Sequence, residues 1–199
     1  MERAQPVVRW MRLPTERWQL RCVGVATVIL SCALLCAQTA KPSESQVEAA
    51  YLYNFGKFVT WPSDRVNTSE EFTICVLGKD PFGPVLDETV NGEQIDGKNV
   101  RIHRISRVQE IRPCNILFVS SSEEERMPAI IAEAQRTHVL TVSDMPHFAE
   151  RGGTIGLVNH NDRIRFEVNR VRAEACHLGL SSELLKVAVR VIGGKPAGN

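Results

Sequence analysis

Short, continuous apolar runs recur along the body of the chain, and they limit its fold more than any other feature. Each run is bounded by glycine or by polar turn residues. The four runs are Phe72–Leu77, Asn115–Val119, Val139–Val142 and Thr154–Val158. Runs of this length are typical of strands that are buried on both faces of a parallel sheet. Helical patterns lie between several of these runs. This alternation predicts an α/β fold, a three-layer sandwich with a mostly parallel central sheet and flanking helices.

The flanking helices are predicted from periodicity and capping residues. Five segments carry these signals, and the first ends before Trp61-Pro62 because a residue that precedes proline disfavours the helical region. In the first segment, apolar residues at three- and four-residue steps predict a buried face made by Tyr51, Phe55 and Phe58, together with Val47, Ala50 and Asn54. The five predicted helices are residues 43–58, 81–90, 120–135, 171–177 and 181–192.

Two further segments alternate between apolar and polar residues, as strands with one solvated face do. In Arg163–Val168, three apolar residues alternate with Arg163, Arg165 and Glu167. This segment follows Thr154–Val158 across a short turn at Asn159–Asn161, so the two are expected to form an antiparallel hairpin at the edge of the sheet. Val100–Ile105 alternates in the same way and is expected near an edge.

The first forty residues have the layout of a secretory signal peptide. Five arginines and two glutamates precede or flank Cys22–Ala37, a run of sixteen uncharged residues that ends in the small residues of Ala37–Ala40. As a helix this run spans about 24 Å, short of the roughly 30 Å hydrocarbon core of a bilayer. A cleaved signal is therefore favoured over a retained anchor. We expect an exported, periplasmic protein whose single domain covers residues 41–199.

The composition of the body argues against several function classes. Residues 41–199 carry 19 Lys and Arg against 21 Asp and Glu, which gives no basic surface for nucleic acid. The chain lacks a phosphate-binding P-loop and a Gly-x-Ser-x-Gly nucleophile elbow. No cluster of Cys and His has metal-ligand spacing. We therefore expect no enzyme, no metal site and no cofactor.

Polar residues at the ends of the predicted parallel strands mark a candidate crevice. Lys79 and Asp80 follow the first strand, and Ser143 and Asp144 follow the third. In open α/β sheets, ligands bind at the carboxyl ends of the strands, so these four residues are candidates for a small-ligand site. The alternative is that they only form turns and cap the following helices.

Two aromatic residues are candidates for contact with a partner protein. Tyr53 and Trp61 lie off the face predicted for the first helix, and Tyr and Trp are enriched in the residues that dominate binding energy at interfaces.

The chain closely resembles the YfiR family of bacterial periplasmic regulators. The resemblance rests on seven motifs in the family's order: Tyr51–Pro62, Ile74–Gly78 with Asp80–Gly83, Cys114–Val119, Val139–Asp144, Phe148–Gly153, Arg163–Glu167 and Gly179–Leu185. It implies a non-enzymatic protein, often dimeric, that binds and modulates an inner-membrane signalling protein. That partner would be a diguanylate cyclase or a sensor kinase. A periplasmic small-ligand binding module, centred on the crevice, is the alternative function.

Three cysteines remain after the predicted cleavage, so at most one disulfide can form within the domain. Cys75 lies inside the first buried strand and Cys114 precedes the second, and these strands are expected to be neighbours. We predict a Cys75–Cys114 disulfide that closes a 39-residue separation and leaves Cys176 free. The alternative is that both cysteines are small buried apolar residues. A second, C-terminal cysteine pair found in some relatives is missing here.

Overall fold

The computed structural model describes residues 42–63 and 70–193. Its eight-stranded mixed sheet lies between helices on both faces, so the predicted α/β class is confirmed. The helical elements are α2 (Glu44–Phe58), α4 (Pro84–Val90), η1 (Val108–Ile111), η2 (Ser121–Arg126), α5 (Met127–Arg136), α6 (Arg170–Ala175) and α7 (Ser182–Val187). The strands are β1 (Val59–Thr60), β2 (Glu71–Leu77), β3 (Gln94–Ile95), β4 (Lys98–Ile105), β5 (Ile116–Val119), β6 (Leu140–Ser143), β7 (Ile155–His160), β8 (Arg163–Asn169), β9 (Gly179–Leu180) and β10 (Arg190–Ile192).

The strand order in the main sheet is β10-β8-β7-β6-β5-β2-β4-β3. Five consecutive strands of this order, β4, β2, β5, β6 and β7, pair in parallel. Strands β7 and β8 form the expected antiparallel hairpin. The hairpin is not the edge of the sheet, because β10 pairs in parallel with β8 outside it. This arrangement brings the carboxyl ends of β2, β5 and β6 to one edge, where the crevice was expected.

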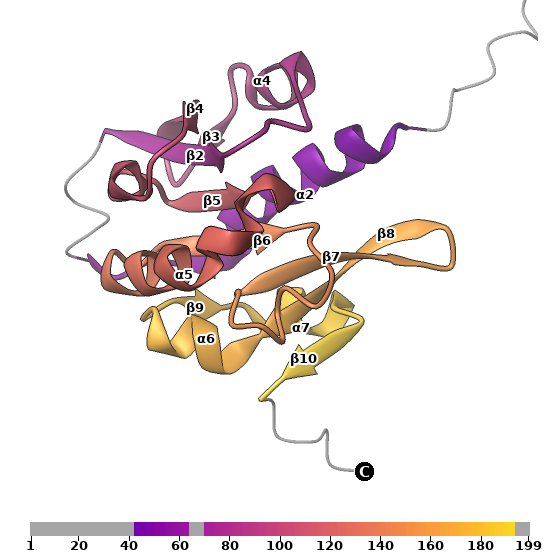
Figure 1. The fold of residues 1–199 in the computed structure, drawn as a ribbon. Coiled ribbons are helices and arrows are strands. Elements are labelled where there is room, and N and C mark those ends of the chain that lie inside the picture. Colours follow the sequence, from indigo (N-terminus) through magenta and orange to yellow (C-terminus); the bar gives the residue numbers. More distant parts are fainter. Residues whose placement is uncertain (1–41, 64–69, 194–199) are drawn as a thin grey trace, which may run out of the picture. The chain divides into compact units, whose positions relative to one another are not determined.

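Two apolar cores lie on opposite faces of the sheet. Residues of α2, α4, α6 and α7 pack on the face that carries Phe72, Ile74 and Val76. The other face carries Cys75 and Leu77 and is covered by η1, α5 and the segment around Phe148. Figure 1 shows α2 passing behind the sheet and α5 in front of it. Both faces of β2 are therefore buried, as its continuous apolar sequence predicts.

The buried face of α2 differs from the predicted one. Phe55 is buried, but Phe58 is 40% exposed and Tyr51 is half-buried. Glu48, Ala49 and Leu52 also point into the protein. The prediction from apolar spacing placed the buried face about one residue away from the observed one, because it did not expect a glutamate to be buried.

The C-terminal segment also differs from its prediction. The helix expected over residues 181–192 ends at Val187, and Arg190–Ile192 forms β10. The backbone turns extended at Ala188, where ψ is 137°. Pairing with β8 decides the conformation of this segment, and that tertiary contact is invisible in a local pattern. The small antiparallel pair of β1 and β9 was not predicted either.

The predicted disulfide between Cys75 and Cys114 is present, with Cα atoms 5.7 Å apart, and Cys176 is free and buried. The two cysteines are not level in the sheet, since Cys75 lies opposite Leu117. Cys114 lies before β5, in a turn where its backbone N–H donates to the Ile111 carbonyl at 2.9 Å. The bond therefore ties a central strand to the turn that precedes its neighbour.

The predicted signal peptide lies outside the described residues, so export by cleavage stays a prediction. Within the described ranges, no helix is long and apolar enough to cross a bilayer. We expect the mature protein to begin between Ala37 and Lys41, as mass spectrometry of the exported chain will show. An uncleaved chain, or a chain that begins with a lipid-modified Cys32 or Cys36, would contradict this prediction.

Candidate functional site

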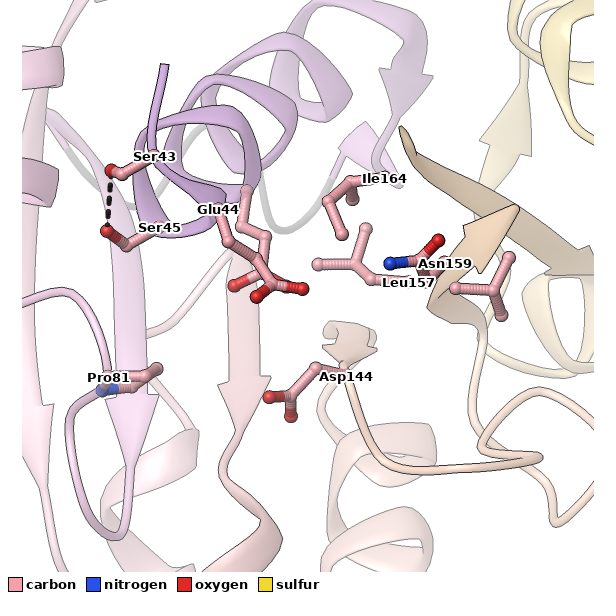
Figure 2. Close-up of a pocket in the computed structure, with 10 residues that line it drawn as sticks. Ser43, Glu44, Ser45, Pro81, Asp144, Leu157, Asn159 and Ile164 are labelled. Atoms are coloured by element: carbon pink, nitrogen blue, oxygen red, sulfur yellow. Dashed lines mark hydrogen bonds between the residues drawn. The ribbon is translucent and has the colours of Figure 1, made fainter. Parts of the chain in front are cut away.

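A cleft of about 530 Å³ opens between the start of α2 and the carboxyl end of β6. Its wall is formed by residues of α2, the segment after β2, the residue after β6, and the β7–β8 hairpin. They are Ser43, Glu44, Ser45, Glu48, Pro81, Asp144, Leu157, Val158, Asn159 and Ile164. Figure 2 shows the carboxylates of Glu44 and Asp144 directed toward the same space. The cleft therefore lies at the edge of the sheet where a crevice was predicted.

The start of α2 is fixed by a capping box, which sets the position of its two glutamates. The Ser43 hydroxyl accepts from the Gln46 backbone N–H at 3.2 Å, and the Gln46 side chain accepts from the Ser43 N–H at 2.8 Å. Glu44 and Glu48 are four residues apart and so share one face of the helix. Glu44 is exposed, but Glu48 is only 5% exposed.

Asp144 is held opposite these glutamates by the residue before it. The buried Ser143 hydroxyl donates to the Val119 carbonyl at 2.6 Å and accepts from the Met145 N–H at 3.1 Å. These bonds tie the end of β6 to the end of β5 and fix the turn that carries Asp144. Ser143 therefore acts as a turn residue, while Asp144 faces the cleft.

The carboxylates of the cleft repel one another when they are ionised. Burial, and to a smaller extent the neighbouring charges of Asp144 and Glu44, raise the pKa of Glu48 to about 7. Burial also raises the pKa of Asp144, to which Glu44 adds. No Lys, Arg or His is among the described residues that line the cleft.

The other two crevice candidates lie outside this cleft. The Asp80 carboxylate accepts from the Phe82 N–H and from Arg104 Nε, both at 2.7 Å. Lys79 is exposed, and its backbone N–H donates to the Ser122 hydroxyl at 3.0 Å. Neither residue lines the cleft, so of the four candidates only Asp144 has a side chain that does.

The sequence prediction missed Glu44 and Glu48, although a signal was present. Two glutamates four residues apart on a helix repel each other, which costs stability unless something else uses the charge. Glu48 also lies on the same helical face as the buried residue Leu52. Core packing alone does not explain a charged residue on an apolar helical face, so Glu48 indicated a further role.

The two predicted partner-contact residues have different surroundings. Trp61 is only 5% exposed, stacks edge-on against Phe72, and directs its indole N–H to the Asn115 carbonyl at 3.3 Å. Trp61 is buried because the chain leaves the helix before this residue and turns it into the core. Tyr53 is half-buried, donates its hydroxyl to Glu93 and packs against the Lys57 ammonium group.

A second depression is apolar and lies between α2 and α7. This groove of about 380 Å³ is lined by Tyr51, Asn54, Phe55, Phe58, Phe166, Glu183, Leu184 and Val187. Phe58 is 40% exposed and Val187 is 56% exposed. Large apolar side chains exposed together mark surfaces that contact other molecules. We call this surface the Phe58–Val187 groove.

In the described ranges, no three His, Cys, Asp or Glu side chains are placed to hold a metal ion. The five histidines, His103, His138, His147, His160 and His177, lie outside the cleft.

Comparison with solved structures shows the fold at low sequence identity. A Streptococcus pneumoniae ABC domain in complex with L-Trp is 14% identical, with a TM-score of 0.51 over 72% of this chain. A conserved domain protein from Vibrio cholerae is 9% identical, with a TM-score of 0.52 over 75% of this chain. The match spans 60% of each of those two chains. A search of curated proteins gives no match.

A family model is more specific than these structural likenesses. The model described as YfiR/HmsC-like matches residues 45–189, which include the strands from β2 to β8, every cleft residue except Ser43 and Glu44, and the Phe58–Val187 groove. Members of that family are regulators rather than enzymes, and they act in the periplasm. The resemblance seen in the sequence motifs is thereby confirmed. The chain belongs to the YfiR/HmsC-like family of periplasmic regulators of cyclic-di-GMP signalling.

Proposed function

We propose that this protein binds the periplasmic part of an inner-membrane diguanylate cyclase and represses it by contact, without catalysing a reaction. Family membership supports the regulatory role. The exposed apolar surface supports the mode of action, because a regulator that works by contact needs a surface whose burial stabilises a complex. The observation that carries the proposal is the Phe58–Val187 groove, in which two large apolar side chains stay exposed.

The groove has the composition of an interface core. Phe166 packs edge-on against Phe55 at its base, with ring centroids 5.1 Å apart, and so gives the groove a rigid floor. Glu183 is the one acidic residue among those that line it. Aromatic and aliphatic residues around few charges are typical of the buried centre of protein interfaces. An apolar segment of the partner would fill this groove.

Tyr53 remains a proposed partner contact on the same helix, although it is not among the residues that line the groove. The homodimer implied by the family resemblance is also a proposal. A second copy and a membrane partner could compete for one apolar surface, so the oligomeric state should be measured with and without the partner.

The substitution Val187→Asp tests the groove directly. It places a charge where an apolar partner surface would cover it, and an unpaired buried charge costs at least about 2 kcal/mol, or roughly thirtyfold in affinity. We expect affinity capture of V187D from solubilised membranes to lose the signalling protein that the wild type retains. Because Val187 is exposed, the melting temperature of the variant should change little.

Val171→Asp is the matched control. Val171 is 58% exposed, also lies in a short helix, and is not among the residues lining the groove. V171D should retain the partner. Equal capture by V187D and the wild type would show that the groove is not the binding surface. Capture of a sensor kinase in place of a diguanylate cyclase would correct the class of partner.

A further inference from the structure

The acidic cleft contains a buried carboxylate without a partner. Glu48 is 5% exposed and lines the cleft, and no hydrogen bond or ion pair joins its carboxylate to a residue in the described part of the chain, while its oxygens are not among the described atoms fully sealed from solvent. Burial removes part of the water around this carboxylate, and no protein donor among the described residues replaces it, which raises the cost of its ionised form. This cost is offset when a donor enters from outside.

The charges around Glu48 define what that donor must be. Glu44 faces it from its own helix, and Asp144 faces it from the turn after β6. The hairpin contributes Asn159, and the segment after β2 contributes Pro81, so neither wall supplies a cation. The positive end of the α2 dipole, about half a charge, offsets only part of three carboxylates. An anion is therefore repelled and a cation is attracted.

The size and walls of the cleft indicate an organic cation. About 530 Å³ lies within the range of small-molecule sites and far exceeds the space of a bare ion. Pro81, Leu157 and Ile164 supply apolar surface beside the carboxylates, suited to methylene groups. The described residues hold no three-ligand group for a metal, which argues against a divalent cation as the occupant.

We propose that this cleft binds a small aliphatic amine, with a primary ammonium group between Glu48 and Asp144 and its methylene chain against Leu157 and Ile164. Such a ligand donates up to three hydrogen bonds from each ammonium group and offsets the repulsion among the carboxylates. A protein that binds such a ligand would sense an organic cation, whichever membrane protein it regulates.

Putrescine is a suitable probe, because it places two ammonium groups on a four-carbon chain. Isothermal titration calorimetry of the purified mature protein at pH 7 should show saturable binding. Butane-1,4-diol and succinate, which have the same chain length with neutral or negative ends, should not bind. Bound ammonium favours the ionised form of Glu48, so a fraction of a proton should be released, as titration in buffers of different ionisation enthalpy will show.

Glu48→Gln removes the central charge with little change in shape. We expect E48Q to bind putrescine at least tenfold more weakly and to lose the proton release, because one charge-assisted hydrogen bond is gone. Glu88→Gln, an exposed change on α4 outside the cleft, should leave both unchanged. V187D should bind putrescine as the wild type does, which separates this site from the partner groove.

Three results would overturn the proposal. They are the absence of putrescine binding, binding that is equal in E48Q and the wild type, and binding of the diol as tight as that of the diamine. None of them bears on membrane capture by the groove, so the cleft proposal and the proposed repressor function can fail separately.

Discussion

The double variant C75A/C114A will lose about 4 kcal/mol of the free energy of unfolding. In the chain-entropy model, a bond that closes a 39-residue separation removes that much conformational freedom from the unfolded chain. Both cysteines are completely buried, in the core that also contains Leu77 and Leu117, so the bond anchors the centre of the sheet. A loss of this size is comparable to the net stability of a modest domain.

Urea denaturation of the mature protein, with and without reductant, measures this effect. Reductant should lower the wild-type midpoint to that of C75A/C114A and should leave the double variant unchanged. Thiol counting on the denatured, unreduced mature protein should find one free thiol, that of Cys176. Three free thiols, or a wild-type midpoint that is insensitive to reductant, would contradict the prediction.

The substitution E48Q will stabilise the protein at high pH by about 2 kcal/mol, a value reduced from the full pKa shift because the cleft admits water. In the folded state Glu48 has a pKa of about 7, against 4.5 for an unperturbed glutamate. The folded protein therefore holds this proton at a pH where the unfolded chain has released it. The stability contributed by Glu48 is complete below about pH 4.5 and is lost as the pH rises toward 7.

Denaturation curves from pH 4 to pH 8 test this sign. The wild type should lose stability relative to E48Q between pH 4.5 and 7, and the two should agree at pH 4. The surface change E88Q should follow the wild type throughout. Parallel curves for E48Q and the wild type over the whole range would show that Glu48 is not destabilised in the folded protein. A loss of folding stability at Glu48 is expected if this residue serves ligand binding, because functional sites often reduce stability.

Local sequence pattern was sufficient where a residue's environment is set by its own strand or turn. The uniform apolar sequence of β2 required burial on both faces, and the alternation of β8 required a hairpin with one solvated face. The disulfide followed from the same reasoning, since β5 lies next to β2 and so brings the turn that holds Cys114 within bonding distance of Cys75. The family motifs fall on these same elements.

Sequence pattern failed where contacts between distant segments decide the outcome. Trp61 is buried because the chain turns back over Phe72 after α2, and Arg190–Ile192 is a strand because β8 offers it an edge. The acidic cleft joins α2 to the end of β6, two segments about a hundred residues apart. Glu48 carried a local signal, a charge on an apolar helical face. The sequence pattern could not show that this charge faces Asp144 across a cleft.

The cellular level of cyclic-di-GMP tests the central claim most directly. It should be measured in a deletion strain that is complemented with the wild type, V187D or V171D at equal periplasmic abundance. If the protein represses a diguanylate cyclase through the Phe58–Val187 groove, deletion raises cyclic-di-GMP, the wild type and V171D restore the low level, and V187D does not. An unchanged level on deletion, or full restoration by V187D, would contradict repression through this groove.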